Sequence, residues 1–138
     1  MSHELFVDTS ALYPLVVRSH PDHTALASVL RERIANGTRI VTSNLVVAES
    51  HALIMRRAGI AVALRFVSLV RASPNIIVTA TSRHEDNAIN DWLSRFDDQQ
   101  FSLTDAVSFV IMSERGMNHA LTLDHHFTIA GFAMITGT

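Results

Sequence analysis

The sequence predicts an α/β fold, in which a mainly parallel sheet carries helices on both faces. Short apolar runs typical of strands alternate along the chain with longer segments of helical spacing. The run Leu5-Phe6-Val7 is apolar continuously instead of alternately, which indicates a strand buried on both faces. Because the chain has 138 residues and neither linker nor repeat, we expect one domain over residues 1–138.

Local signals set the expected bounds of each element. Apolar runs predict strands at Glu4–Thr9, Arg39–Thr42, Asn75–Ala80, His119–Leu123 and Phe132–Thr136. Capping residues and helical spacing predict the helices. The first three are Ser10–Arg18, a helix capped by Asp22 that ends near Gly37, and a helix capped by Ser43 or Asn44 that ends at Arg57. The next two are Ile60–Ala72 and Ser82–Phe96, the second with Ser82 as cap and Glu85 three residues later. The last is capped by Ser102 and ends near Gly116.

Composition excludes several classes of protein. Apolar residues make up 48% and charged residues 17%, which is typical of a globular domain and not of a disordered chain. Without cysteine there can be no disulfide, thiolate zinc site or cysteine nucleophile. All 11 basic residues are arginine, so mechanisms that need a lysine are excluded. We see neither a signal peptide nor a membrane span, and expect a cytoplasmic protein.

Four acidic residues stand where the predicted elements begin or end. Asp8 and Asp124 close strands, Asp105 lies in the first turn of a helix, and Glu49 interrupts an apolar stripe that we expect to face inward. A carboxylate in such a place is costly unless it is paired or binds a cation. Taken singly, Asp8 could cap a helix, Asp105 could form a capping box with Ser102, and Asp124 could serve a turn. Together the four predict a divalent-metal site at the carboxyl edge of the sheet and hydrolysis of a phosphodiester.

The chain resembles the PIN-domain family, and most closely its VapC-type ribonuclease toxins of bacterial toxin–antitoxin pairs. The segments that carry the resemblance are Phe6-Val7-Asp8-Thr9-Ser10-Ala11-Leu12, Val47-Ala48-Glu49, Ser102-Leu103-Thr104-Asp105-Ala106 and Thr122-Leu123-Asp124-His125-His126-Phe127. They occur in family order over the whole chain. The resemblance implies a three-layer α/β/α sandwich with five parallel strands in the order 3-2-1-4-5.

The resemblance also implies magnesium- or manganese-dependent cleavage of RNA. Asp8, Glu49, Asp105 and Asp124 match the family's acidic quartet, and Thr9 and Thr104 match hydroxyl positions beside the metal ligands. Carboxylate oxygens suit Mg²⁺ or Mn²⁺. We expect Asp8 and Asp105 to bind the principal ion directly. The family leaves open whether the chain is a toxin with an antitoxin partner or a housekeeping RNA-processing nuclease.

Arginines and histidines near the acidic residues have alternative roles. Arg56 and Arg57 follow Glu49 by two helical turns and are expected to contact RNA phosphates, although a solvated helix end explains them equally well. A histidine–carboxylate zinc site around Asp124 is conceivable. We disfavour it because strand alternation would send the rings of His125 and His126 apart.

Competing readings have specific weaknesses. A receiver-like domain normally has a lysine beside its acidic cluster, and a phosphatase with an aspartate nucleophile needs a second aspartate where Ser10 stands. A non-catalytic RNA- or protein-binding domain would not need the acidic quartet. The helix Ile60–Ala72 has a wide apolar arc, which predicts a homodimer or a groove for an antitoxin peptide.

Overall fold

The computed structural model describes residues 3–137, so residues 1–2 and 138 of the predicted domain lie outside it. Five parallel strands form one sheet in the order β3-β2-β1-β4-β5, as the sequence predicts. The strands are β1 (Glu4–Val7), β2 (Arg39–Ser43), β3 (Ile76–Val78), β4 (His119–Leu121) and β5 (Ala133–Ile135). All five predicted strands are present; β2 ends one residue later than predicted, and the other four are shorter than predicted.

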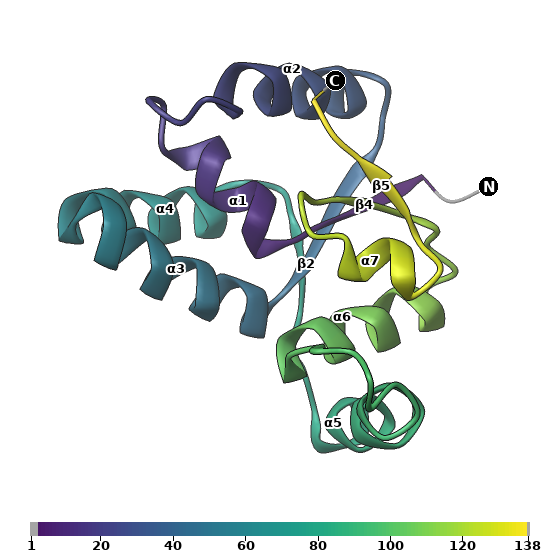
Figure 1. Cartoon of the computed structure of the whole chain (residues 1–138). Coiled ribbons are helices and arrows are strands. Elements are labelled where there is room, and N and C mark those ends of the chain that lie inside the picture. Colours follow the sequence, from purple (N-terminus) through teal and green to yellow (C-terminus); the bar gives the residue numbers. More distant parts are fainter. Residues whose placement is uncertain (1–2, 138) are drawn as a thin grey trace.

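Helices cover both faces of this sheet (Figure 1). They are α1 (Thr9–Val16), α2 (His23–Ala35), α3 (Asn44–Ala58), α4 (Ile60–Ala72), α5 (Ser82–Ala88), α6 (Leu103–Glu114) and α7 (His126–Ile129). A π-helical turn, η1 (Ile89–Leu93), extends α5. None of the helices within residues 3–137 is long and apolar enough to cross a membrane.

The central strand β1 shows why the molecule has three layers. Leu5 and Val7 pack with Ala11 of α1 and Leu26 of α2. Phe6, which points to the other face, belongs to the larger core around α6. A strand buried on both sides needs a continuous apolar run, and that run is what the sequence shows. The predicted α/β/α sandwich is therefore confirmed.

One predicted helix begins differently. Thr81, not Ser82, caps α5: its hydroxyl accepts from the backbone N–H of His84, and its own N–H donates to His84 Nδ1 at 3.0 Å. His84 is 6% exposed, so its burial fixes the register of the capping box one residue earlier than predicted. Beyond the predicted elements, the sequence analysis missed the short helix α7 altogether.

Candidate active site

Acidic side chains gather at the carboxyl edge of β1 and β4. These two strands pair in parallel, so the residues that follow them meet at the same edge. Asp8 comes directly after β1, and Asp124 comes three residues after β4. Asp105 enters from the first turn of α6. The structure thus brings three of the four predicted carboxylates to one place.

Asp8 is buried and is held by hydroxyl groups. Its Oδ2 accepts hydrogen bonds from the Ser10 hydroxyl at 2.9 Å and from the Thr122 hydroxyl at 3.1 Å. The backbone N–H of Ser10 donates to the same oxygen, so Asp8 is also the N-cap of α1. The capping alternative is therefore confirmed, and it is compatible with the predicted role of Asp8 in a metal site. Ser10 Oγ also accepts from the N–H of Leu123 at 2.8 Å, which ties α1 to the chain after β4.

Burial leaves Asp8 poorly stabilised as an anion. The pKa of Asp8 is raised from 3.8 to about 6, chiefly because burial removes the carboxylate from water. The hydrogen bond from the Ser10 side chain opposes this rise, and the negative charge of Asp105 adds to it. Asp8 and Asp105 therefore lie close enough for their charges to repel each other.

Asp105 and Asp124 converge with His126. Each of these three residues offers one ligand atom, and the three atoms lie within 4.8 Å of one another. His126 Nδ1 lies 3.1 Å from Asp105 Oδ2 and 3.5 Å from Asp124 Oδ1. Asp105 also forms the capping box with Ser102. Within residues 3–137 this is the one group of histidine and carboxylate side chains with such spacing.

The geometry corrects the argument about the histidines. His125 and His126 do not lie on a strand, because β4 ends at Leu121 and α7 begins at His126. His125 is exposed, whereas the His126 ring faces the two carboxylates. The alternation that we used against a histidine beside Asp124 is therefore wrong. The spacing of His126, two residues after Asp124 at a turn, was the signal available in the sequence.

Glu49 also differs from expectation. We predicted that it faces inward, but it is exposed on α3 and forms neither a hydrogen bond nor an ion pair in the described part of the chain. The buried polar residue of this turn is its neighbour Ser50, whose hydroxyl donates to Thr9 Oγ1 at 3.3 Å. The buried face of α3 runs through Val46, Ser50 and Ile54, each one position after the residue that we predicted to face inward.

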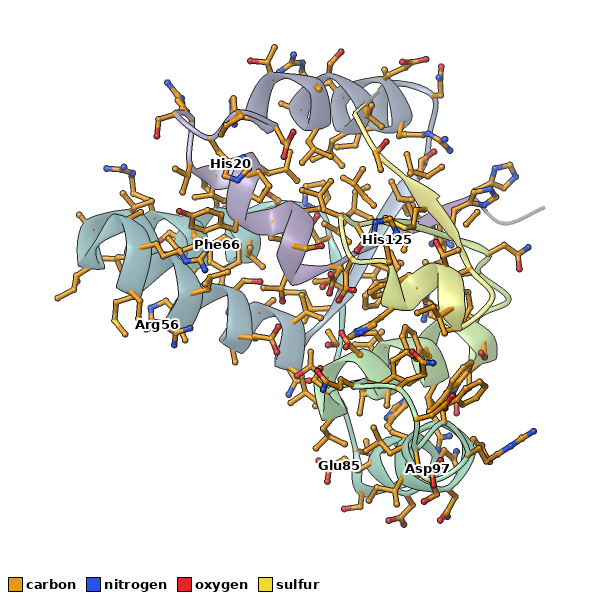
Figure 2. The ribbon with its side chains drawn as sticks, viewed as in Figure 1. His20, Arg56, Phe66, Glu85, Asp97 and His125 are labelled. Atoms are coloured by element: carbon orange, nitrogen blue, oxygen red, sulfur yellow. The ribbon has the colours of Figure 1, made fainter. Side chains whose placement is uncertain are left out.

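The remaining predicted residues are spread over the molecule. Thr9 is buried beside Asp8, and Thr104 is half-buried beside Asp105. Arg56 lies on the outer side of α3 (Figure 2). Arg57 instead sits over the ring of Tyr13, with its guanidinium carbon 5.5 Å from the ring centre. The sequence analysis missed Ser10 and Thr122, the two hydroxyls that hold Asp8.

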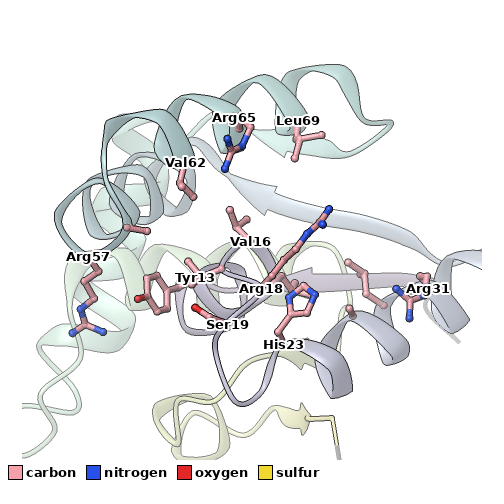
Figure 3. A pocket seen from close by; sticks show the side chains of 15 residues that line it. Tyr13, Val16, Arg18, Ser19, His23, Arg31, Arg57, Val62, Arg65 and Leu69 are labelled. Atoms are coloured by element: carbon pink, nitrogen blue, oxygen red, sulfur yellow. The ribbon is translucent and has the colours of Figure 1, made fainter.

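A groove of about 1550 Å³ opens at the other end of α1 (Figure 3). Its floor is apolar, with Val16 and Val62 among its residues. Its charged lining consists of four exposed arginines from four different segments, Arg18, Arg31, Arg57 and Arg65. Among the described residues, no carboxylate lines the groove and none of the four arginines forms an ion pair.

Comparison with known proteins gives the family. The model of the PIN domain family matches residues 5–133. The chain belongs to the PIN domain family. A curated relative, the 23S rRNA-specific endonuclease VapC20 of Mycobacterium tuberculosis, is 31% identical over 96 residues, which are 70% of this chain and 72% of the relative.

Two solved structures share the fold of this chain. The crystal structure of M. tuberculosis VapC20, described as a Sarcin-Ricin loop cleaving toxin, matches with a TM-score of 0.87 and 28% identity, covering 96% of this chain and 98% of that one. FitAcB from Neisseria gonorrhoeae matches with a TM-score of 0.64 over 96% and 97% of the two chains. At 12% identity, the second likeness shows the fold alone.

Proposed function

We propose that this protein is a metal-dependent endoribonuclease and the toxin of a toxin–antitoxin pair. The convergence of Asp105 and Asp124 beside the buried Asp8 carries the proposal. Crowded carboxylates repel one another and are stabilised by a divalent cation. The relation to VapC20, a 23S rRNA-specific endonuclease, supports RNA as the substrate.

The donor set fits Mg²⁺ or Mn²⁺. Hard carboxylate oxygens predominate, and the described site offers no sulfur ligand. Asp8, Asp105 and Asp124 would hold the principal ion, and Glu49, which is exposed on α3, would bind through water or hold a second ion. When bound, the ion neutralises the charge that grows on the phosphate during hydrolysis.

This chain's own residues orient that site. Ser10 and Thr122 fix the Asp8 carboxylate in one position through their hydroxyls. Thr9 follows Asp8 and Thr104 precedes Asp105 in the chain, and we propose that their hydroxyls contact substrate or coordinated water. Arg56, exposed on α3, is proposed to contact an RNA phosphate. Arg57 lines the groove, which favours a role in partner binding over the predicted contact with RNA.

Cleavage of a defined RNA tests the proposal. A stem-loop copied from 23S rRNA is incubated with the purified protein in Mg²⁺, in Mn²⁺ and in EDTA. We expect cleavage with either ion and none in EDTA, with 5′-phosphate and 3′-hydroxyl ends because water is the nucleophile. Cleavage that persists in EDTA, or a 2′,3′-cyclic phosphate, would contradict the metal mechanism.

The groove supports the toxin reading over a housekeeping nuclease. An apolar floor rimmed by four arginines without acidic partners is complementary to an amphipathic segment with an acidic face. We propose that an antitoxin places such a segment there. A short upstream reading frame that encodes a DNA-binding protein with an acidic, amphipathic tail would favour the toxin, and its absence would favour RNA processing.

The outer face of α4 supports a homodimer. Ile60 is 76% exposed and Leu64 is 64% exposed, and both are large apolar side chains on one helix. Burial of such surface is favourable at about 25 cal/mol per Å², before the cost of association is subtracted. We expect light scattering to show a dimer that Leu64→Arg dissociates. Ile34→Glu, a matched change at an exposed residue of α2, should leave the dimer intact.

A further inference from the structure

His126 is fixed in place by contacts that do not depend on its charge. Its backbone N–H donates to Asp124 Oδ1 at 2.9 Å. Its ring meets Phe101 edge to face, with centroids 5.2 Å apart and planes at 81°. Phe101 is buried and belongs to the main core, so the ring rests on a rigid support. The imidazole is therefore positioned toward the two carboxylates before any ion or substrate arrives.

The distances from His126 Nδ1 to the acids suit ligands of one ion. Mg²⁺ and Mn²⁺ form bonds of about 2.1 Å in octahedral geometry, so neighbouring ligand atoms stand about 3 Å apart. His126 Nδ1 lies 3.1 Å from Asp105 Oδ2 and 3.5 Å from Asp124 Oδ1. An imidazole that only forms an ion pair with the carboxylates would have similar distances. The electron spin-echo spectrum of bound Mn²⁺ separates the two cases.

We propose that His126 Nδ1 is a direct ligand of the ion that Asp105 and Asp124 hold. The inference rests on the proposed function, because it concerns the ion at the same site. A nitrogen donor changes the preference of that site. Imidazole binds transition-metal ions better than it binds Mg²⁺, which prefers oxygen ligands. The site should therefore select Mn²⁺ over Mg²⁺ more strongly than a site of carboxylates alone.

Electron spin-echo spectroscopy of bound Mn²⁺ tests this in the full-length protein. We expect nitrogen modulation of the Mn²⁺ signal in the wild type and in His125→Ala, the exposed neighbour that serves as the control. The modulation should be absent from His126→Ala and His126→Asn. Calorimetric titration should show Mn²⁺ affinity lowered about tenfold or more in both variants. Mg²⁺ affinity should fall less, particularly in His126→Asn, which supplies an amide oxygen.

Several results would overturn the proposal. Wild-type protein that binds Mn²⁺ without nitrogen modulation would show that His126 pairs with the acids and leaves the ion to oxygen ligands. Equal loss of Mn²⁺ and Mg²⁺ affinity in the variants would refute the selectivity. The wild-type spectrum decides the question even if a variant folds poorly, which circular dichroism detects. RNA cleavage is measured separately: nitrogen modulation without cleavage would refute the proposed function and leave His126 as a ligand.

Discussion

At the amino-terminal end of α1, Asp8 is buried among hydroxyls and lies beside another carboxylate, whereas the carboxyl-terminal end opens into a groove rimmed by exposed arginines. Asp8 and Asp105 repel each other, and a bound cation would relieve that repulsion. The arginines are exposed to water, so their charges are stable without a partner and remain available for binding one. A single short helix thus separates a site suited to chemistry from a surface suited to recognition.

The largest expected effect lies at the acidic end. Asp105→Asn keeps the shape of the side chain and an oxygen that can accept from Ser102, but removes an anionic ligand. We expect RNA cleavage to fall by about a hundredfold or more, equivalent to roughly 2.7 kcal/mol of transition-state stabilisation. Single-turnover rates at saturating Mg²⁺ measure it. Asp22→Asn, at an exposed N-cap without a side-chain hydrogen bond, is the control and should leave the rate unchanged.

Asp8→Asn tests whether burial makes the acidic end costly without metal. The pKa of Asp8 is about 6 in the folded protein and near 3.8 when unfolded, so the folded state binds the proton more tightly. The stability that protonated Asp8 contributes is present below about pH 4 and is lost as the pH rises through 6. The full loss is at most about 3 kcal/mol, and roughly half of it falls between pH 5 and 7.5.

Urea unfolding in EDTA at pH 5 and pH 7.5 measures this difference. Asp8→Asn should become more stable relative to wild type as the pH rises, because the buried charge is absent. The amide oxygen can still accept the hydrogen bonds from Ser10 and Thr122. A stability difference between variant and wild type that is independent of pH would show that hydration or the hydroxyls already compensate the charge.

Most of the fold and half of the site could be predicted from the sequence. Strand β1 could be predicted because burial on both faces requires a continuous apolar run, which Leu5-Phe6-Val7 provides. Asp8, Asp105 and Asp124 could be found because they sit where predicted elements begin or end. Which side of α3 faces inward could not be predicted, because the consecutive apolar residues Val46-Val47-Ala48 do not single out one side. Packing in the folded protein buries Ser50 instead of Glu49.

The partners of these acids were harder to foresee. Ser10 and Thr122 are 112 residues apart in the chain, yet their hydroxyl oxygens lie 3.0 Å apart. That contact depends on the pairing of β1 with β4, which local sequence patterns do not encode. His126 was missed because α7 has only four residues, too few for a helical period to appear. The arginine groove likewise collects residues from four segments.

A smaller effect is expected at the groove. Arg65→Glu places a negative charge on the wall of the groove and should weaken antitoxin binding about tenfold, mainly through slower association, because charge complementarity is lost. Arg71→Glu is the matched control, because Arg71 is exposed on the same helix but does not line the groove. Surface plasmon resonance with the product of the neighbouring reading frame measures both. RNA cleavage by free Arg65→Glu should equal that of the wild type, and equal weakening by the two variants would refute a groove-specific contact.

The smallest effect concerns Tyr13, which lies on α1 only five residues after Asp8 but belongs to the groove. Its ring supports the Arg57 guanidinium and meets His20 edge to face at 5.6 Å. A cation–π contact at an exposed site contributes about 0.5–1 kcal/mol, so Tyr13→Leu should weaken partner binding only a few-fold. A double-mutant cycle with Arg57→Ala isolates the contact from the loss of apolar area. If Tyr13→Leu lowered RNA cleavage or Mn²⁺ affinity as much as partner affinity, the two ends of α1 would be coupled, and the separation of chemistry from recognition would be wrong.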